Sequence, residues 1–143
     1  MRSGFAVGAM TLAISLVHSG PSFSEGALAV GVPPKPDWLG VSMGLTANKA
    51  TVDEAKRVAT EACKLQGSVI SKLLCKVVAT FSNQCAALAL DPEVGMKGFG
   101  WAIANSGQAA ANQAILNCRE TAGPGRAEAC VIMGRVVCDG SAN

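Results

Sequence analysis

The segment from Glu61 to Cys85, EACKLQGSVISKLLCKVVATFSNQC, places three cysteines across two different sequence patterns. Up to Cys63, alanine and cysteine recur at the spacing of one helix face. From Cys75, CKVVATF is rich in the β-branched and apolar residues that central strands favour. The segment therefore predicts a helix that ends near Cys63, a loop, and a strand that begins near Cys75.

The chain contains this pattern twice. Four segments of the first copy have counterparts in the second: GALAVG (26–31) and AALALD (86–91), LGVSMG (39–44) and FGWAIA (99–104), TVDEAKRVATEACK (51–64) and SGQAAANQAILNCR (106–119), and LCKVVATFSNQC and ACVIMGRVVC, which end at Cys85 and Cys138. The first two pairs are offset by 60 residues and the helical pair by 55. This alignment gives the first copy five extra residues, near LTANK.

Each copy predicts two short strands, a helix and a third strand. The turn formers of VPPKPDW and PEVGMKG separate the first two strands. Thr51 with Glu54 forms a capping box, and Ser106 is the equivalent N-cap. We therefore expect an α+β fold in which two β-β-α-β repeats form one disulfide-stapled domain, with both helices packed on β-sheet. Its simplest form is a single sheet whose halves are related by a pseudo-twofold axis.

The N-terminus has the layout of a secretory signal peptide. Arg2 precedes an apolar run of about 13 residues from Phe5 to Val17, whereas roughly 20 are needed to span a bilayer. Small residues at Ser22 and Ser24 predict cleavage after Ser24. We expect a signal peptide over 1–24 and a secreted or periplasmic domain over 25–143, with repeats at about 26–85 and 86–138 and no stable membrane insertion.

The composition of the mature chain excludes several classes of function. Removal of 24 residues leaves 119, enough for one modest core. The 12 Lys and Arg less Arg2 leave 11 against 10 Asp and Glu, a formal charge of +1 that does not favour nucleic acid. The one histidine, His18, lies in the predicted signal peptide, so neither Ser-His-Asp nor Cys-His catalysis is expected.

All six cysteines lie in the mature part, an even number that indicates disulfides in an exported chain. An unbroken strand would separate Cys75 from Cys85 by roughly 30 Å, whereas bridged Cα atoms lie within about 7 Å. A helix end, in contrast, can return beside the start of the next strand, and equivalent cysteines can meet near a pseudo-twofold axis. The predicted disulfides are therefore Cys63–Cys75, Cys118–Cys130 and Cys85–Cys138. A cysteine metal site and thiol-disulfide catalysis are weaker alternatives, because the chain has no C-x-x-C pair.

CKVVATFSNQCAALAL, GFGWAIA, the alanine-rich helix that ends in cysteine, and ACVIMGRVVC together resemble the bacterial domain of unknown function 4189 family. The resemblance covers Gly26 to Cys138. It implies an exported α+β domain with paired cysteines and implies no catalytic residues. The chain departs from the pattern in the proline-rich stretch around Pro34, and Val41 stands where the second copy has Trp101.

Two acidic residues and one glycine-rich stretch are candidate sites with simpler interpretations. Asp91 and Glu93 could serve as an acid-base pair, but Asp91 followed by proline is a typical turn start. GMKGFG (95–100) matches no phosphate-binding spacing and is better interpreted as a hairpin loop.

The aromatic and basic residues suggest surfaces rather than catalysis. Trp101 is expected in the core. Trp38, which follows PPKPD, is expected to be exposed and is the first candidate for a partner-binding surface. Four basic loop residues are interpreted as solvated surface: Lys64, Lys72, Lys76 and Arg126.

The sequence favours an exported, non-catalytic small domain that binds a protein or a cell-envelope component, as an effector, an inhibitor or an accessory protein. We expect no catalytic residue, no metal and no cofactor. The alternative is a histidine-free hydrolase or other enzyme that uses Ser, Asp, Glu or Lys.

Overall fold

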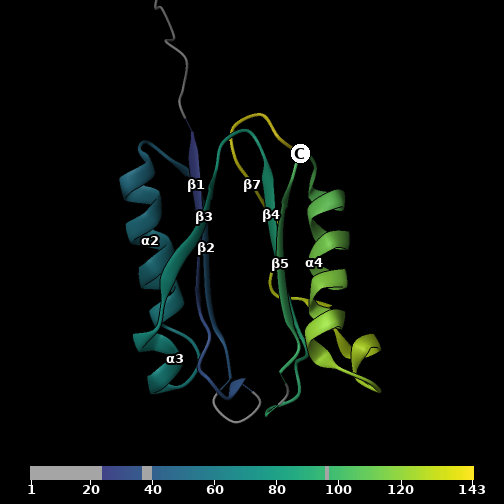
Figure 1. Ribbon diagram of the computed structural model, residues 1–143. Helices are drawn as coiled ribbons and strands as arrows, with labels where there is room; N and C mark the ends of the chain where they lie inside the picture. Colours follow the sequence, from purple (N-terminus) through teal and green to yellow (C-terminus); the bar gives the residue numbers. More distant parts are fainter. Residues whose placement is uncertain (1–23, 37–39, 96) are drawn as a thin grey trace, which may run out of the picture.

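The computed structural model describes residues 24–36, 40–95 and 97–143. The predicted signal peptide over 1–24 lies outside the described residues apart from Ser24. The described chain is an α+β domain with four layers, helix, sheet, sheet and helix, as Figure 1 shows. This confirms the predicted fold class.

Each half of the chain supplies one sheet and the helix outside it. The first half contains β1 (Glu25–Gly31), β2 (Ser42–Lys49), α2 (Val52–Lys64), α3 (Val69–Leu73) and β3 (Lys76–Phe81). The second half contains β4 (Cys85–Leu90), β5 (Phe99–Ala104), α4 (Gly107–Ala122), the 3₁₀ helix η1 (Ala127–Ala129), β6 (Val131–Ile132) and β7 (Val137–Cys138). All strand pairs are antiparallel.

The strands form two sheets rather than the single sheet that is the simplest expectation from sequence. The order is β2-β1-β3 in one sheet and β5-β4-β6 in the other, where β7 also pairs with β4. The central strands β1 and β4 have neighbours on both sides, so neither offers an edge through which the sheets could join. The halves meet face to face instead.

The residues of the central strands alternate between small and large, and this alternation makes the layers. Ala27 and Ala29 of β1 are buried under α2, whereas Leu28 points between the sheets. Ala89 of β4 is buried under α4 in the same way, and Leu88 points between the sheets. The inter-sheet core consists of buried Leu28, Val30, Met43 and Leu88, with partly buried Val41, Leu45, Leu90, Phe99, Trp101 and Met133 around them.

The helices pack closely on their sheets because both contact surfaces are built from small residues. Ala55, Ala59 and Cys63 of α2 are fully buried, and Thr51 caps the helix by accepting from the Glu54 amide. A Cβ at Gly44 in β2 would overlap the α2 backbone at Ala59 and Cys63. In the second half, the facing glycine is Gly100 of β5, and a Cβ there would overlap the backbone of α4 at Ala114 and Cys118.

This packing corrects one part of the sequence alignment. Gly44 pairs with Ala29 and Gly100 with Ala89, so the second strands of the halves correspond with an offset of 56 residues rather than 60. The counterpart of Trp101 is accordingly Leu45 and not Val41. Most of the extra residues of the first copy therefore lie in the loop before β2, not near LTANK, which forms the second part of β2.

The third strand of the second half is shorter than the sequence indicates. CVIMGRVV forms two pieces, β6 and β7, on either side of Gly134, whose φ of 68° takes the backbone out of the extended conformation. Cys138 lies on β7 directly opposite Cys85 on β4. The break lets one segment pair with both ends of β4.

The structure contains three disulfides, and they are the three predicted pairs. Cys63–Cys75 and Cys118–Cys130 each join residues 12 apart, and each ties the C-terminal part of a helix to the segment that leads into the next strand. Cys85–Cys138 joins residues 53 apart within the second sheet. The described residues contain no free cysteine.

A buried carboxylate closes the end of the domain next to the third disulfide. Asp139 is fully buried, and its Oδ1 accepts from the Ser24 hydroxyl at 2.6 Å and from the Asn48 amide at 2.7 Å. Its Oδ2 accepts from the Asn83 amide at 3.3 Å. One side chain thus links the start of β1, the end of β2, the β3–β4 loop and the C-terminal segment.

The disulfides are predicted to differ in their effect on stability. Replacing Cys85 and Cys138 by alanine is expected to lower the free energy of unfolding by about 4 kcal/mol, because that bridge closes the longest loop. Replacing either of the 12-residue pairs is expected to cost about 3 kcal/mol. Chemical unfolding of the three double variants measures these losses of unfolding free energy. The prediction is contradicted if the Cys85 and Cys138 variant loses less than the other two.

Candidate binding surface

Asp91 and Glu93, the candidate acid-base pair of the sequence analysis, form ion pairs with Arg126. Arg126 donates from Nε to Asp91 Oδ2 at 2.8 Å and from Nη2 to Oδ1 at 2.6 Å, and its Nη1 lies 2.7 Å from Glu93 Oε2. The Asp91 side chain has no exposed area, and its Oδ1 also accepts from the Glu93 amide at 3.1 Å. The turn interpretation of these residues therefore fits the geometry, whereas the description of Arg126 as simply solvated is wrong.

The same contacts determine the protonation of Asp91. The hydrogen bonds from Arg126 hold the pKa of Asp91 below its ordinary value of 3.8, and the carboxylate in turn raises the pKa of Arg126. Such a carboxylate is fully ionised near neutral pH, and both of its oxygens are occupied. It is therefore poorly suited to accept a proton in general base catalysis.

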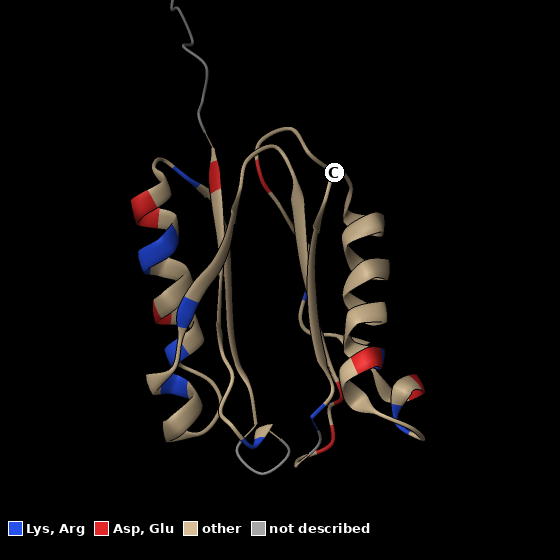
Figure 2. Cartoon of the chain, in the orientation of Figure 1, with Lys and Arg blue, Asp and Glu red and all other residues tan. Residues whose placement is uncertain are grey.

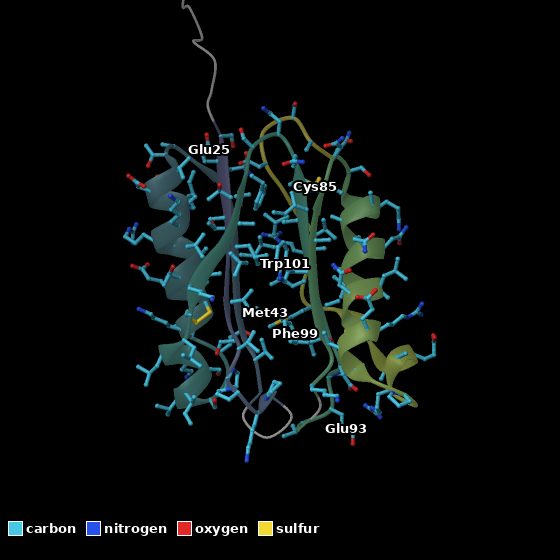
Figure 3. All side chains as sticks on the ribbon, in the orientation of Figure 1. Glu25, Met43, Cys85, Glu93, Phe99 and Trp101 are labelled. Carbon is cyan, nitrogen blue, oxygen red and sulfur yellow. A yellow bond between two sulfur atoms is a disulfide. The ribbon has the colours of Figure 1, made fainter. Side chains whose placement is uncertain are left out.

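The other sequence-predicted sites fall in different parts of the molecule. Trp38 lies outside the described residues. Gly95 and Gly98 belong to the loop between β4 and β5, consistent with a hairpin loop. Trp101 is half-buried between the sheets, where Figure 3 places it beside Phe99 and Met43. The structure does not bring these residues together into one site.

The two loops closed by the 12-residue disulfides differ strongly in character. Residues 64–74, KLQGSVISKLL, contain five large aliphatic residues and no carboxylate, whereas residues 119–129, RETAGPGRAEA, contain no large aliphatic residue. In the first loop, Leu65 is 80% exposed, Val69 74% and Leu73 79%. Ile70 and Leu74 are also exposed. We call the side chains of Leu65, Val69, Ile70, Leu73 and Leu74 the α3 surface.

The short helix α3 departs from the usual amphipathic pattern, because its serine points inward while most of its aliphatic residues are exposed. Ser71 is fully buried, and its hydroxyl lies 2.7 Å from that of Ser42 on β2. Ser68 caps the helix by accepting from the Ser71 amide at 3.1 Å, and Ser42 donates to the Gln66 carbonyl. Since these serines hold one side of α3 against the sheet, its apolar side faces outward.

The charges around the α3 surface are positive. Lys64, Lys72 and Lys76 lie within or beside the loop, and the chain has no Asp or Glu between Glu61 and Asp91. Figure 2 shows blue and no red on α3. The opposite loop is different, because Arg119 pairs with Glu128 at 2.8 Å and Arg126 with Asp91 and Glu93.

An apolar cleft of about 300 Å³ adjoins the α3 surface where the two sheets meet. Leu74 contributes to both features. The cleft is otherwise lined by Val30, Val32, Lys76, Val78, Phe99 and Trp101. The exposed apolar area of the first half therefore continues from α3 toward the space between the sheets.

Sequence reasoning did not identify the α3 surface as a site. A signal was present, because a run of aliphatic residues in a disulfide-closed loop has no counterpart in the second copy. The run also looks like the ordinary start of a buried strand. Only the burial of Ser71 shows which side of it faces solvent.

The part of the chain that the structure describes contains no cluster of three or more His, Cys, Asp or Glu residues placed to hold a metal ion. None of its helices is long and apolar enough to cross a membrane.

Comparison with known proteins gives one match. A family model described as "Domain of unknown function (DUF4189)" matches residues 26–138. No curated protein and no solved structure matches the chain.

The ion pair of Asp91 predicts a pH dependence of stability. Because the folded-state pKa of Asp91 is lowered, its contribution is complete above its ordinary value of 3.8 and is lost as the pH falls through the lower folded-state pKa. Asp91→Asn should therefore reduce the free energy of unfolding at pH 6, and this difference from the wild type should shrink at pH 2 to 3. Urea unfolding at both pH values measures the difference.

The control for this experiment is Glu128→Gln, which removes an exposed ion pair and should change stability little at either pH. A loss in Asp91→Asn that stays constant between the two pH values would contradict the assignment.

Proposed function

Because the chain belongs to the DUF4189 family, whose description names no activity, we propose its function from its own surfaces. The protein is an exported, non-catalytic domain that binds a protein or a cell-envelope component through the α3 surface. The observation that carries this proposal is the outward exposure of Val69 and Leu73 around a buried Ser71.

Exposed aliphatic side chains of this kind favour a binding role. Val69 and Leu73 are four residues apart on α3, so they lie on the same side of the helix. Single exposed apolar residues are ordinary on protein surfaces, whereas contiguous apolar groups are typical of interaction sites. The disulfide and the serine contacts hold this group in place before a partner arrives, which lowers the entropy cost of binding.

The disulfides and the N-terminal pattern support export. Three disulfides are typical of proteins that fold in an oxidising compartment, such as the periplasm or the extracellular space. The basic start, apolar run and small residues before Glu25 are typical of a signal peptide.

The polar groups of the described residues support a non-catalytic role over the enzyme alternative. Asp91 and Glu93 are engaged by Arg126. The hydroxyls of Ser42 and Ser71 bond to one another and to backbone carbonyls rather than to a general base. A serine nucleophile needs such a base within hydrogen-bonding reach.

The proposal predicts that the α3 surface controls attachment to the envelope. Val69→Ser combined with Leu73→Ser should reduce retention of the protein by isolated cell envelopes at least tenfold, because two apolar contacts are lost. Both side chains are exposed, so the variant should fold normally. Retention is measured as the fraction of protein that sediments with the envelopes.

The matched control is Leu116→Ser, a similarly large apolar residue that is 49% exposed on α4. It should be retained as well as the wild type. Equal retention of the wild type and the Val69 and Leu73 variant would refute binding through the α3 surface.

A further inference from the structure

We propose that the α3 surface docks on a membrane surface rich in anionic lipid headgroups and lies on it without spanning it. This inference rests on the proposed function, because it names the component that the same surface binds. It is carried by three features of the loop between Cys63 and Cys75: the shape of its apolar group, its charge, and its rigidity.

The apolar side chains project from the molecule. Leu65, Val69 and Leu73 are each about three-quarters exposed or more, so little of their area is sheltered by neighbouring atoms. A projecting group needs a partner that accommodates it on all sides. The boundary between headgroups and acyl chains does so without a preformed pocket, and aliphatic side chains lie favourably at that depth.

The charges next to these side chains match an anionic surface. Lys64 and Lys72 are in the loop, and Lys76 follows it. Among the described residues, no carboxylate forms an ion pair with any of the three. Lysine stems can pack along apolar groups while the ammonium remains at the headgroups. The nearest carboxylate in the preceding sequence, Glu61, pairs with Arg57. The basic and apolar surface is therefore complementary to anionic lipid.

The loop is held in the docking arrangement by contacts on its inner side. Cys63–Cys75 closes it, and the Ser42, Ser68 and Ser71 hydroxyls bond beneath α3. A Cβ at Gly31 would overlap the Ser71 carbonyl, which shows how closely β1 approaches the loop. Figure 1 shows α3 at one end of the first half, beyond the C-terminal end of α2.

The size of the helix determines the mode of binding. α3 has five residues, far fewer than the roughly 20 needed to span a bilayer. Its apolar face can enter only the interface, with the two-sheet core outside the membrane. Attachment is therefore reversible, and it weakens as salt screens the lysines.

The experiment is co-sedimentation of the disulfide-intact protein with vesicles of phosphatidylcholine alone and of phosphatidylcholine with phosphatidylglycerol. The wild type should bind the anionic vesicles at least tenfold more tightly than the zwitterionic ones. Val69→Ser with Leu73→Ser should lose at least tenfold of that binding. Lys64→Gln with Lys72→Gln should lose about fivefold for each lysine.

Two control variants carry equivalent changes elsewhere. Leu116→Ser removes an exposed leucine from α4, and Lys56→Gln removes an exposed lysine from the N-terminal half of α2. Both should bind the anionic vesicles within about twofold of the wild type. Circular dichroism of all variants establishes that they are folded.

Three outcomes would overturn the lipid assignment. They are failure of the wild type to bind anionic vesicles, equal binding to both kinds of vesicle, and a wild type that is dimeric in solution while the Val69 and Leu73 variant is monomeric. The last result would assign the α3 surface to a second copy of the chain.

The envelope experiment separates these failures from failure of the proposed function. If envelope retention depends on Val69 and Leu73 but the protein does not bind vesicles, the binding function stands. The partner is then a protein component of the envelope. Envelope retention that does not depend on these residues would refute both proposals.

Discussion

The alternation of small and large side chains along β1 and β4 is the constraint on which the rest of the structure depends. Alanines on one face of each strand allow a helix to approach until backbone meets backbone at Gly44 and Gly100. Leucine and valine on the other face need a second apolar layer, and the other half supplies it. Neither half could bury both faces alone, so the two sheets and two helices fold as one domain.

Much of this could be predicted from the sequence because the signals are local. The caps at Thr51 and Ser106, the helix faces and the disulfide-closed loops all depend on residues close in the chain. The division into two sheets depends on which strands flank β1 and β4, and this is not a local property. The alignment of the second strands was wrong for a related reason, since only the strand register and the helix contacts show that Gly44 corresponds to Gly100.

The exposed α3 surface was harder to predict than the fold. A run of leucine, valine and isoleucine before a strand is normally buried, and the sequence alone favours that interpretation for residues 69–74. The deciding residue is Ser71, which occupies the inward position and forms hydrogen bonds with Ser42 and Ser68. A buried hydroxyl with partners leaves the apolar residues on the outer side of the same short helix.

The difference between the halves connects the fold to the proposed function. Both halves use a disulfide of the same span to hold the segment between helix and strand. In the second half, Arg126 and Asp91 fix that segment by an ion pair, and its surface is polar. In the first half, hydroxyls buried beneath α3 hold the segment, so no ion pair is needed to fix it. Among the described residues, no carboxylate pairs with Lys64, Lys72 or Lys76. The same scaffold thus carries one neutralised loop and one that is apolar and basic, and the second is the loop to which we assign binding in our proposal.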